Sequence, residues 1–243
     1  MSEPLSEELV GRLNLFLPRY LERCENIQSR NGRFVYYTSA ETAMQIILKG
    51  EVWLRNARSM NDFSEVEHGF DCLRDAFSDS EEGKNLQHYL ESRFPGLVKK
   101  WANHIDGWLP TLRNQTYMIC VSEHDDSEDK HGRLSMWRAY GNKHSVALVL
   151  NNGPFLNDTD AFRAYSFPVE YKGSGYVKEQ FALLEERLRA NESQTKDLGE
   201  DDMLGWLFYL SRVLILCVKH PGFKEEREWR VIYSPDIESS KNV

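Results

Sequence analysis

The stretch Phe34-Val-Tyr-Tyr-Thr-Ser-Ala-Glu-Thr-Ala-Met-Gln-Ile-Ile-Leu-Lys-Gly50 joins a strand pattern directly to a helix pattern. Its aromatic and β-branched start is typical of a β-strand. Thr38 and Glu41 have the spacing of a capping box, which predicts a helix over residues 40–49 with Thr38 as its N-cap. Gly50 ends this helix, because glycine readily adopts the left-handed conformation that often follows a helix. The helix is expected to bury three apolar side chains: Ala43, Ile46 and Ile47.

Strand and helix patterns alternate irregularly on either side of this unit. Further strands are expected at 52–54, 117–121, 145–150, 165–171 and 229–233. Further helices are expected at 64–78, 80–113, 176–192 and 201–218, with a turn at Pro95-Gly96 in the second. Since a doubly wound parallel sheet needs regular alternation, we predict a single α+β domain over residues 31–243. Its sheet should be mixed or mostly antiparallel, with helical insertions at about 64–113 and 176–218.

Residues 1–30 are interpreted as a separate N-terminal helical segment. Leucines in this segment repeat at near-helical spacing, which predicts an amphipathic helix. Pro18 lacks a backbone N–H and is expected to kink or split that helix. The start of the sequence shows no secretory signal, and no apolar run has membrane-spanning length. We therefore expect a cytoplasmic protein without a membrane partner.

Composition narrows the classes of function. The chain has 243 residues, with 38 acidic and 30 basic side chains and a net charge of −8. This balance argues against a protein that coats nucleic acid non-specifically, because such binding depends on many lysines and arginines. Four scattered cysteines without a CxxC pair argue against a disulfide framework or a zinc ribbon. The phosphate-binding and hydrolase motifs GxGxxG, GxxxxGK[ST], HExxH and GxSxG are absent.

The late segment Glu225-Glu-Arg-Glu-Trp-Arg230 is the densest candidate for chemistry. If it is a strand, Glu226, Glu228 and Arg230 share one face. A carboxylate beside an arginine stays ionised and oriented, so it can accept a hydrogen bond from a sugar hydroxyl. The alternative is an exposed, salt-bridged face without a function.

Two further segments combine groups that suit a nucleotide. Residues 133–141 contain Ser135, Trp137, Arg138 and Tyr140, and aromatic rings with arginines suit a planar ring and a phosphate. The alternative is that the two rings only fill the core. Tyr36-Tyr-Thr38 ends a strand and precedes a capped helix, where side chains and backbone groups can face a ligand.

The loop from Glu123 to His131 contains histidines and carboxylates, which are metal ligands in many proteins. Its spacing matches no established ligand pattern, and its composition is that of a solvated loop. We therefore expect no metal. Asn61 and Asp62 indicate a turn and a helix cap.

Three motifs resemble those of an uncharacterised bacterial family. Its signatures are an FNDPFE-like turn, a central LSxWRxY stretch and a late FxxExEWR segment. The corresponding residues here are Met60-Asn-Asp-Phe-Ser-Glu65, Leu134-Ser-Met-Trp-Arg-Ala-Tyr140 and Phe223-Lys-Glu-Glu-Arg-Glu-Trp-Arg230. The last two match closely, whereas only Asn61, Asp62 and Glu65 of the first are kept. The resemblance extends over residues 34–234.

A more distant resemblance is to ADP-ribosyltransferases, especially bacterial toxins of that class that modify DNA. Their first strand ends in His-x-Thr and leads into a helix closed by Ile-Leu-x-x-Gly. This sequence has Tyr36-Tyr-Thr38 followed by Ile46-Ile-Leu-Lys-Gly50, with tyrosine in place of the histidine. The class also has a catalytic glutamate on a late strand, for which Glu228 is the match and Glu226 the second choice.

This resemblance implies an ADP-ribosyltransferase-like fold and NAD as the substrate, without a metal. Glu228 would hydrogen-bond the ribose and stabilise positive charge that develops as the nicotinamide bond breaks. Tyr36 would contact the adenosine-side ribose, and Trp137 or Tyr140 would stack on nicotinamide. Arg138 or Arg230 would neutralise the pyrophosphate. The other contacts in the matched motifs are Thr38, Ser135 and Asn61.

Three hypotheses follow. The first is an NAD-using ADP-ribosyltransferase or NAD glycohydrolase, acting as a toxin or an anti-phage defence effector on a nucleic-acid or protein acceptor. The second is a non-enzymatic module that binds a nucleotide or a nucleic-acid end in the same pocket. The third is a structural protein in which Glu226, Glu228, Arg138 and Arg230 pair with one another and leave no cavity. Convergence of Tyr36, Tyr140 and Glu228 on one pocket distinguishes the first two from the third.

Overall fold

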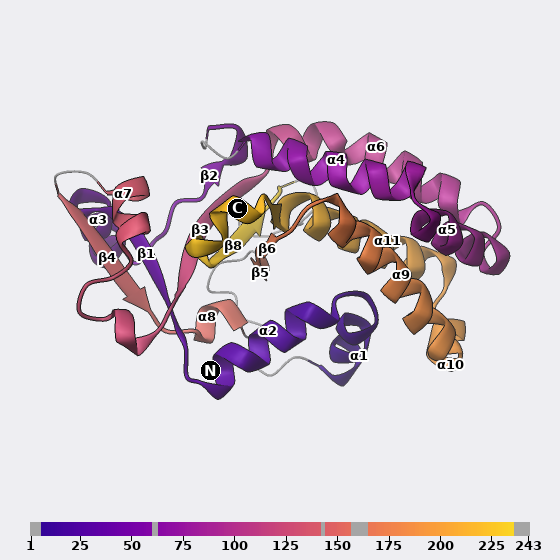
Figure 1. The fold of residues 1–243 in the computed structure, drawn as a ribbon, viewed down its shortest axis with the longest axis horizontal. Helices are drawn as coiled ribbons and strands as arrows, with labels where there is room; N and C mark the ends of the chain where they lie inside the picture. The colour runs from indigo at the N-terminus through magenta and orange to yellow at the C-terminus, as the bar shows by residue number, and fades with distance from the viewer. Residues whose placement is uncertain (1–5, 60–62, 142–143, 157–164, 236–243) are drawn as a thin grey trace.

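A central antiparallel sheet organises the molecule. The computed structural model describes residues 6–59, 63–141, 144–156 and 165–235. The sheet has the strand order β4-β1-β3-β8-β5, and β2 pairs with β3 beside this path (Figure 1). These strands are β1 (Arg33–Ser39), β2 (Arg55–Asn56), β3 (Tyr117–His124), β4 (Ser145–Leu150), β5 (Tyr165–Pro168) and β8 (Glu228–Tyr233). A separate parallel pair is formed by β6 (Glu170–Tyr171) and β7 (Val218–Lys219).

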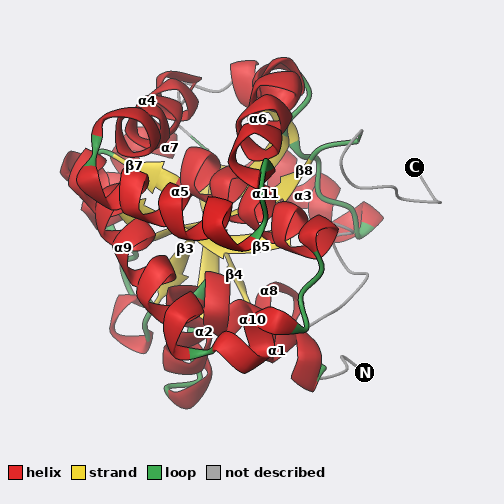
Figure 2. Ribbon diagram, turned by 90° about the vertical axis from the view of Figure 1, so that its right-hand side faces the viewer, coloured by secondary structure: helices red, strands yellow, loops and turns green. Residues whose placement is uncertain are grey.

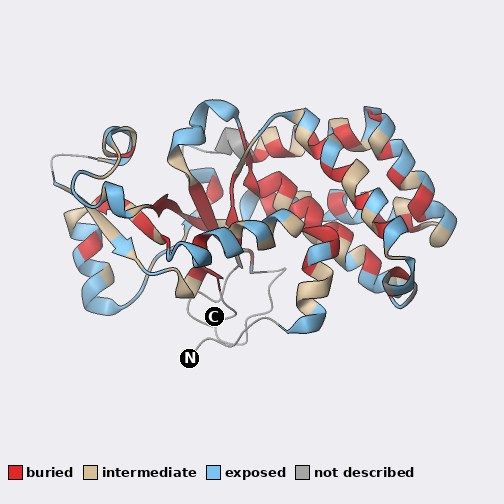
Figure 3. Ribbon diagram, turned by 60° about the horizontal axis from the view of Figure 1, so that its bottom comes forward, coloured by how far each residue is buried: buried red, intermediate tan, exposed pale blue. Residues whose placement is uncertain are grey.

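Helices surround the strands (Figure 2). The first insertion contains α4 (Phe63–Asp79), α5 (Glu81–Arg93) and α6 (Leu97–Asn114), and the second contains α9 (Ser174–Ala190), α10 (Glu192–Lys196) and α11 (Glu200–Cys217). The long helices turn their buried faces toward one another (Figure 3). Fully buried Trp101 lies in this core, where its indole N–H donates to Ser211 Oγ at 3.0 Å. The predicted α+β architecture with two helical insertions and a mostly antiparallel sheet is confirmed.

Short elements complete the chain. The remaining helices are α1 (Glu7–Phe16), α2 (Pro18–Ser29), α3 (Ala40–Lys49), α7 (Leu134–Tyr140) and α8 (Gly153–Leu156). Three 3₁₀ turns are η1 (Ala57–Ser59), η2 (Asp126–Glu128) and η3 (Pro221–Glu226). The split at Pro18 is as predicted. Within the described part of the chain, no helix is long and apolar enough to span a bilayer.

The two N-terminal helices pack onto the rest of the fold. Phe16 of α1 is buried and stacks on Trp206 of α11, with 5.4 Å between ring centroids. Cys24 and Ile27 of α2 are buried in a core cluster beneath the sheet that includes Trp229. The apolar residues of this segment therefore contribute to two hydrophobic clusters, one among the long helices and one at the sheet.

Local details around α3 differ from the sequence expectation. The N-cap is Ser39, whose hydroxyl accepts from the Thr42 N–H, because β1 continues through Thr38 to Ser39 and the helix begins only at Ala40. Gly50 ends the helix at φ 67°, as predicted. Ala43 is buried, but Ile47 is 66% exposed. The reason is that only one narrow side of α3 contacts β1 and β4, so most of the helix surface stays uncovered.

The expected strand at 52–54 is also displaced. Only Arg55 and Asn56 pair with β3, opposite Met118 and Tyr117. Residues 52–54 run past β3 without forming a ladder. An extended segment of this kind leaves its side chains available to line a cavity.

The two strands at the centre of the sheet diverge. β1 pairs with β3 only over Arg33–Val35, opposite Ser122–His124. Beyond Val35, β1 remains paired with β4 as far as Ser39 and leaves β3. Figure 1 shows β1, β4, α3 and α7 grouped at one end of the molecule as a result. The divergence opens a space between β1 and β3, at the end of β1 that leads into α3.

A glycine determines how closely two long helices approach. A Cβ added at Gly69 of α4 would lie 2.0 Å from the carbonyl oxygen of Ile215 in α11. We expect Gly69→Ala to lower the free energy of unfolding by about 2–3 kcal/mol, because the helices must separate. Gly205→Ala is the matched control, since nothing lies within 4 Å of its added Cβ. It should raise stability by up to about 1 kcal/mol. Urea unfolding of both variants checks this, and equal effects of the two would contradict it.

Candidate functional site

A cavity of about 710 Å³ occupies the space between the diverging strands. One wall consists of the end of β1 and the face of α3 that carries Thr42, Gln45 and Lys49. The opposite wall is β3, and residues 51–55 close one side. Side chains of α7 and of the turn before β8 complete the lining. The volume is typical of sites that bind small molecules or cofactors.

Two carboxylates from the late segment reach this cavity. Glu226 and Glu228 both line it, although Glu228 is only 4% exposed. The predicted alternation is wrong for Glu226, because β8 begins at Glu228 and Glu226 is the last residue of η3. The two side chains are joined by Lys219, whose Nζ lies 2.6 Å from Glu226 Oε2 and 3.2 Å from Glu228 Oε2. A fully buried lysine therefore holds both carboxylates at one place.

The charge of Glu228 is determined by its surroundings. Burial by itself would raise the pKa of this carboxyl, but the charges of Arg230 and Lys219 outweigh burial and lower its pKa to about 2. Arg230 Nε donates to Glu228 Oε1 at 2.8 Å, and the Cys120 thiol adds a hydrogen bond. Glu228 is thus ionised at neutral pH and held in one orientation, with part of its charge compensated.

Three other predicted residues lie around the same cavity. Tyr36 and Thr38 line it from β1, and Tyr140 lines it from the end of α7. Tyr140 is 42% exposed, so part of its side chain faces solvent. Tyr36, Tyr140 and Glu228 therefore converge on one cavity, although they lie far apart in the sequence. The structural hypothesis required Glu226, Glu228, Arg138 and Arg230 to pair with one another and leave no cavity. Arg230 does pair with Glu228, but both carboxylates line a cavity.

The other predicted contacts do not line the cavity. Trp137 packs edge-on against Tyr37 at 4.9 Å and donates to the His131 carbonyl, so it fills the space behind the wall. The Ser135 hydroxyl is buried behind the lining. Arg138 is exposed outside it. Arg230 is 1% exposed and donates to the Leu216 carbonyl as well as to Glu228. Asn61 lies outside the described residues.

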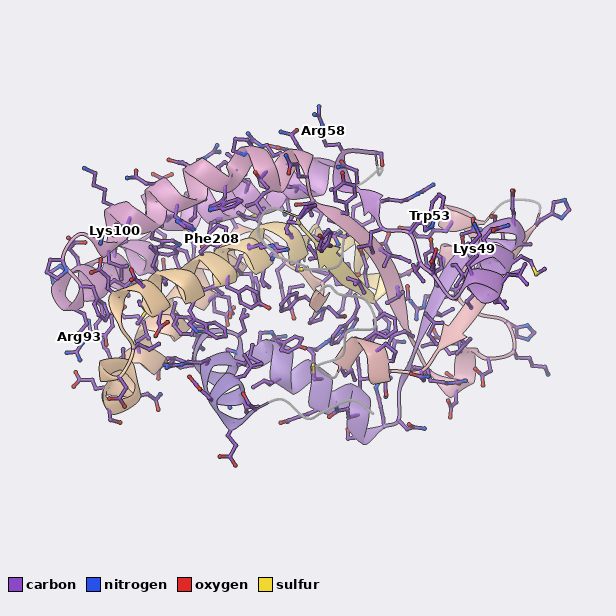
Figure 4. The ribbon with its side chains drawn as sticks, turned by 180° about the vertical axis from the view of Figure 1, so that it is seen from behind. Lys49, Trp53, Arg58, Arg93, Lys100 and Phe208 are labelled. Atoms are coloured by element: carbon purple, nitrogen blue, oxygen red, sulfur yellow. The ribbon has the colours of Figure 1, made fainter. Side chains whose placement is uncertain are left out.

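Among the lining residues that were not predicted, three could contact a nucleotide. Trp53 is 78% exposed, and Lys49 and Arg55 are exposed cations that line the same space. Figure 4 shows Trp53 and Lys49 together at the α3 end of the molecule, with Arg58 farther away. The sequence pattern of 52–54 indicates a strand, which predicts a covered tryptophan. Residues 52–54 have no pairing partner in the sheet, and a local sequence pattern does not show this.

The acidic loop is exposed over residues 126–127 and 129–131, as its composition predicts, but its start is buried. Glu123 and His124 are buried, and Glu123 accepts from Arg23, Arg30 and the Trp229 indole N–H. Asp125, Glu128 and Asp129 pair with four arginines: Arg30, Arg33, Arg133 and Arg227. Among the described residues, no group of three or more His, Cys, Asp or Glu side chains could hold a metal ion. The loop is instead an ion-pair network at the point where β1 and β3 are paired.

Comparison with known proteins gives one match. A family model described as a protein of unknown function (DUF2971) matches residues 136–231. The matched region contains Tyr140, Glu226 and Glu228, but not Tyr36 or the α3 wall. This part of the chain is therefore similar to an uncharacterised family. No curated protein and no solved structure matches the chain.

Proposed function

We propose that the protein uses NAD as an ADP-ribosyltransferase or NAD glycohydrolase, on an ADP-ribosyltransferase-like fold. The observation that carries the proposal is the convergence of Tyr36, Tyr140 and Glu228 on one cavity of about 710 Å³. An ionised, oriented carboxylate can accept a hydrogen bond from a ribose hydroxyl. It can also stabilise the positive charge that develops as the bond to nicotinamide breaks. Glu226, held by the same lysine, is the second carboxylate of the site.

The contacts expected for the rest of the dinucleotide change accordingly. The two arginines expected at the pyrophosphate do not line the cavity, so we assign this role to Lys49 and Arg55. Both are exposed, and neither forms an ion pair with another described residue. Tyr140 and Trp53 offer flat rings to the nicotinamide or adenine, and Tyr36 faces a ribose. Glu41 and Glu51 also line the cavity, so the site is mixed in charge and not generally basic.

One observation favours the alternative of a non-enzymatic nucleotide-binding module. Arg230 and Lys219 already compensate the charge of Glu228. A compensated carboxylate stabilises a developing cation less than a carboxylate without partners does. Such a site could recognise the ribose without accelerating its chemistry.

Incubation with NAD separates the two functions. The first function predicts release of nicotinamide. The ADP-ribosyl group then passes either to water, giving free ADP-ribose, or to a protein or nucleic-acid acceptor. The second predicts that NAD or ADP-ribose raises the melting temperature without any release. A ligand at a concentration 100 times its dissociation constant stabilises the folded protein by about 2.7 kcal/mol. A thermal scan detects a stabilisation of this size as a higher melting temperature. If NAD causes no nicotinamide release and no stabilisation, both functions are refuted. We place the proposed activity in the cytoplasm, where the four cysteines remain free thiols, as a toxin or defence effector.

Two neighbouring residues of α7 give a matched test of the binding site. We expect Tyr140→Ala to weaken NAD binding about tenfold, because loss of ring stacking costs about 1–3 kcal/mol per base. Arg138→Ala should leave the dissociation constant unchanged, since Arg138 is exposed away from the cavity lining. Isothermal titration with NAD measures both variants. Equal losses for the two would contradict the placement of the ligand.

A further inference from the structure

Arg133 connects three elements that line the cavity. It is the N-cap residue of α7, which carries Met136 and Tyr140 into the lining. Its backbone N–H donates to the hydroxyl of Tyr37 on β1 at 2.8 Å. Its guanidinium reaches the turn before β8, where Nη1 donates to the carbonyls of Glu225 at 2.9 Å and Glu226 at 3.1 Å.

The guanidinium itself is held from behind. Nη2 donates to the Glu123 carbonyl at 2.8 Å, and Nε donates to Glu128 Oε1 at 3.0 Å. The side chain is 13% exposed, so these bonds form with little competition from water. Arginine is suited to this task because its planar fork carries five donors in a rigid geometry. Lysine has the charge but lacks the fork.

The turn that Arg133 holds is strained. Arg227, between the two candidate carboxylates, has a φ of 47°, in the left-handed region that non-glycine residues rarely adopt. Such a conformation persists only where surrounding contacts determine it. The Glu225 and Glu226 carbonyls, both held by Arg133, directly precede Arg227 and are part of those contacts.

We propose that Arg133 is a positioning residue, which fixes the strained turn beside α7 so that Glu226 and Glu228 face the cavity. The proposal rests on the proposed function for the catalytic role of these carboxylates. The geometry of the turn is independent of that role. Arg133 is also the N-cap of α7, which carries Tyr140. One residue therefore positions both the carboxylates and the aromatic ring at the ligand site.

Arg133→Lys tests this with a preserved charge. We expect backbone amides at 226–229 to exchange hydrogen about tenfold faster than in the native protein, while amides of α11 are unchanged. Nicotinamide release should slow by about 10- to 100-fold in kcat with little change in KM, because a small displacement of a catalytic group is costly. Glu128→Gln, which removes one anchor of the guanidinium, should give a smaller change of the same kind. Arg74→Gln, an exposed arginine paired with Asp71, is the control and should change neither readout.

The outcomes separate the two proposals. Unchanged exchange at 226–229 in Arg133→Lys overturns the positioning role. Faster exchange throughout α11 also overturns it, because Arg133 would then contribute only to global stability. If the native protein releases no nicotinamide, the proposed function fails, and the exchange measurement still decides the role of Arg133.

Discussion

Glu228→Gln should slow nicotinamide release by about 100-fold or more, the usual effect of removing one group that stabilises the transition state. The amide cannot offset positive charge on the ribose. The same change leaves Arg230 and Lys219 with less negative charge in a buried site. We therefore also expect the free energy of unfolding to fall by about 3–5 kcal/mol. Release assays and urea unfolding at neutral pH measure the two effects.

Two variants separate chemistry from stability. Glu228→Asp keeps the charge but withdraws the carboxylate by one methylene, so it should fold well and still lose about 10- to 100-fold in rate. Glu225→Gln changes an exposed carboxylate of the same turn that does not line the cavity, and it should behave as the native protein. Native rates in both Glu228 variants would show that another residue carries the reaction.

Acid should unfold the protein through Glu228 more than through any exposed carboxylate. The pKa of Glu228 is about 2 in the folded protein, against 4.5 for the unperturbed group. The folded state therefore binds fewer protons than the unfolded state between these values, and stability falls as the pH drops through that window. The contribution above the window is on the order of 3 kcal/mol. Asp125, Glu128 and Asp129 of the acidic loop also have lowered pKa values, through arginine or histidine partners, and act in the same direction.

Urea unfolding of native and Glu228→Gln protein between about pH 5 and pH 2 isolates this group. The variant has no carboxyl to titrate at this position, so its stability should depend less steeply on pH. The two curves should approach each other as the pH falls. Parallel curves would mean that Glu228 has an ordinary pKa in the folded protein, and that the loop carboxylates account for acid unfolding.

Local sequence patterns predicted most elements but not the way in which they end. The strand at 145–150 and the helix at 40–49 are found with the expected bounds, because β-branched residues favour the strand and Gly50 ends the helix. The N-cap moved from Thr38 to Ser39 because pairing with β4 extends β1 by a further residue. The strand expected at 52–54 is absent because pairing with β3 is limited to Arg55 and Asn56.

The candidate site was predicted in part. Glu226, Glu228, Tyr36, Thr38 and Tyr140 line the cavity. Trp137 and Arg230 have the expected chemistry but point into protein interiors, where ring packing and a buried ion pair satisfy them. Residue type shows what a side chain can bind. It does not show whether the side chain lies on the inner or outer surface of a wall.

The sequence by itself determined the α+β class, the helical insertions and a carboxylate–arginine segment at the start of the last strand. These depend on neighbours within a few positions along the chain. Only the tertiary structure decided that β1 leaves β3 after Val35, and this divergence creates the cavity. It also decided that the acidic loop neutralises Arg133 and Arg227, whereas Lys49 and Arg55 line the cavity. These features depend on pairings between distant residues, whose energies no local pattern contains.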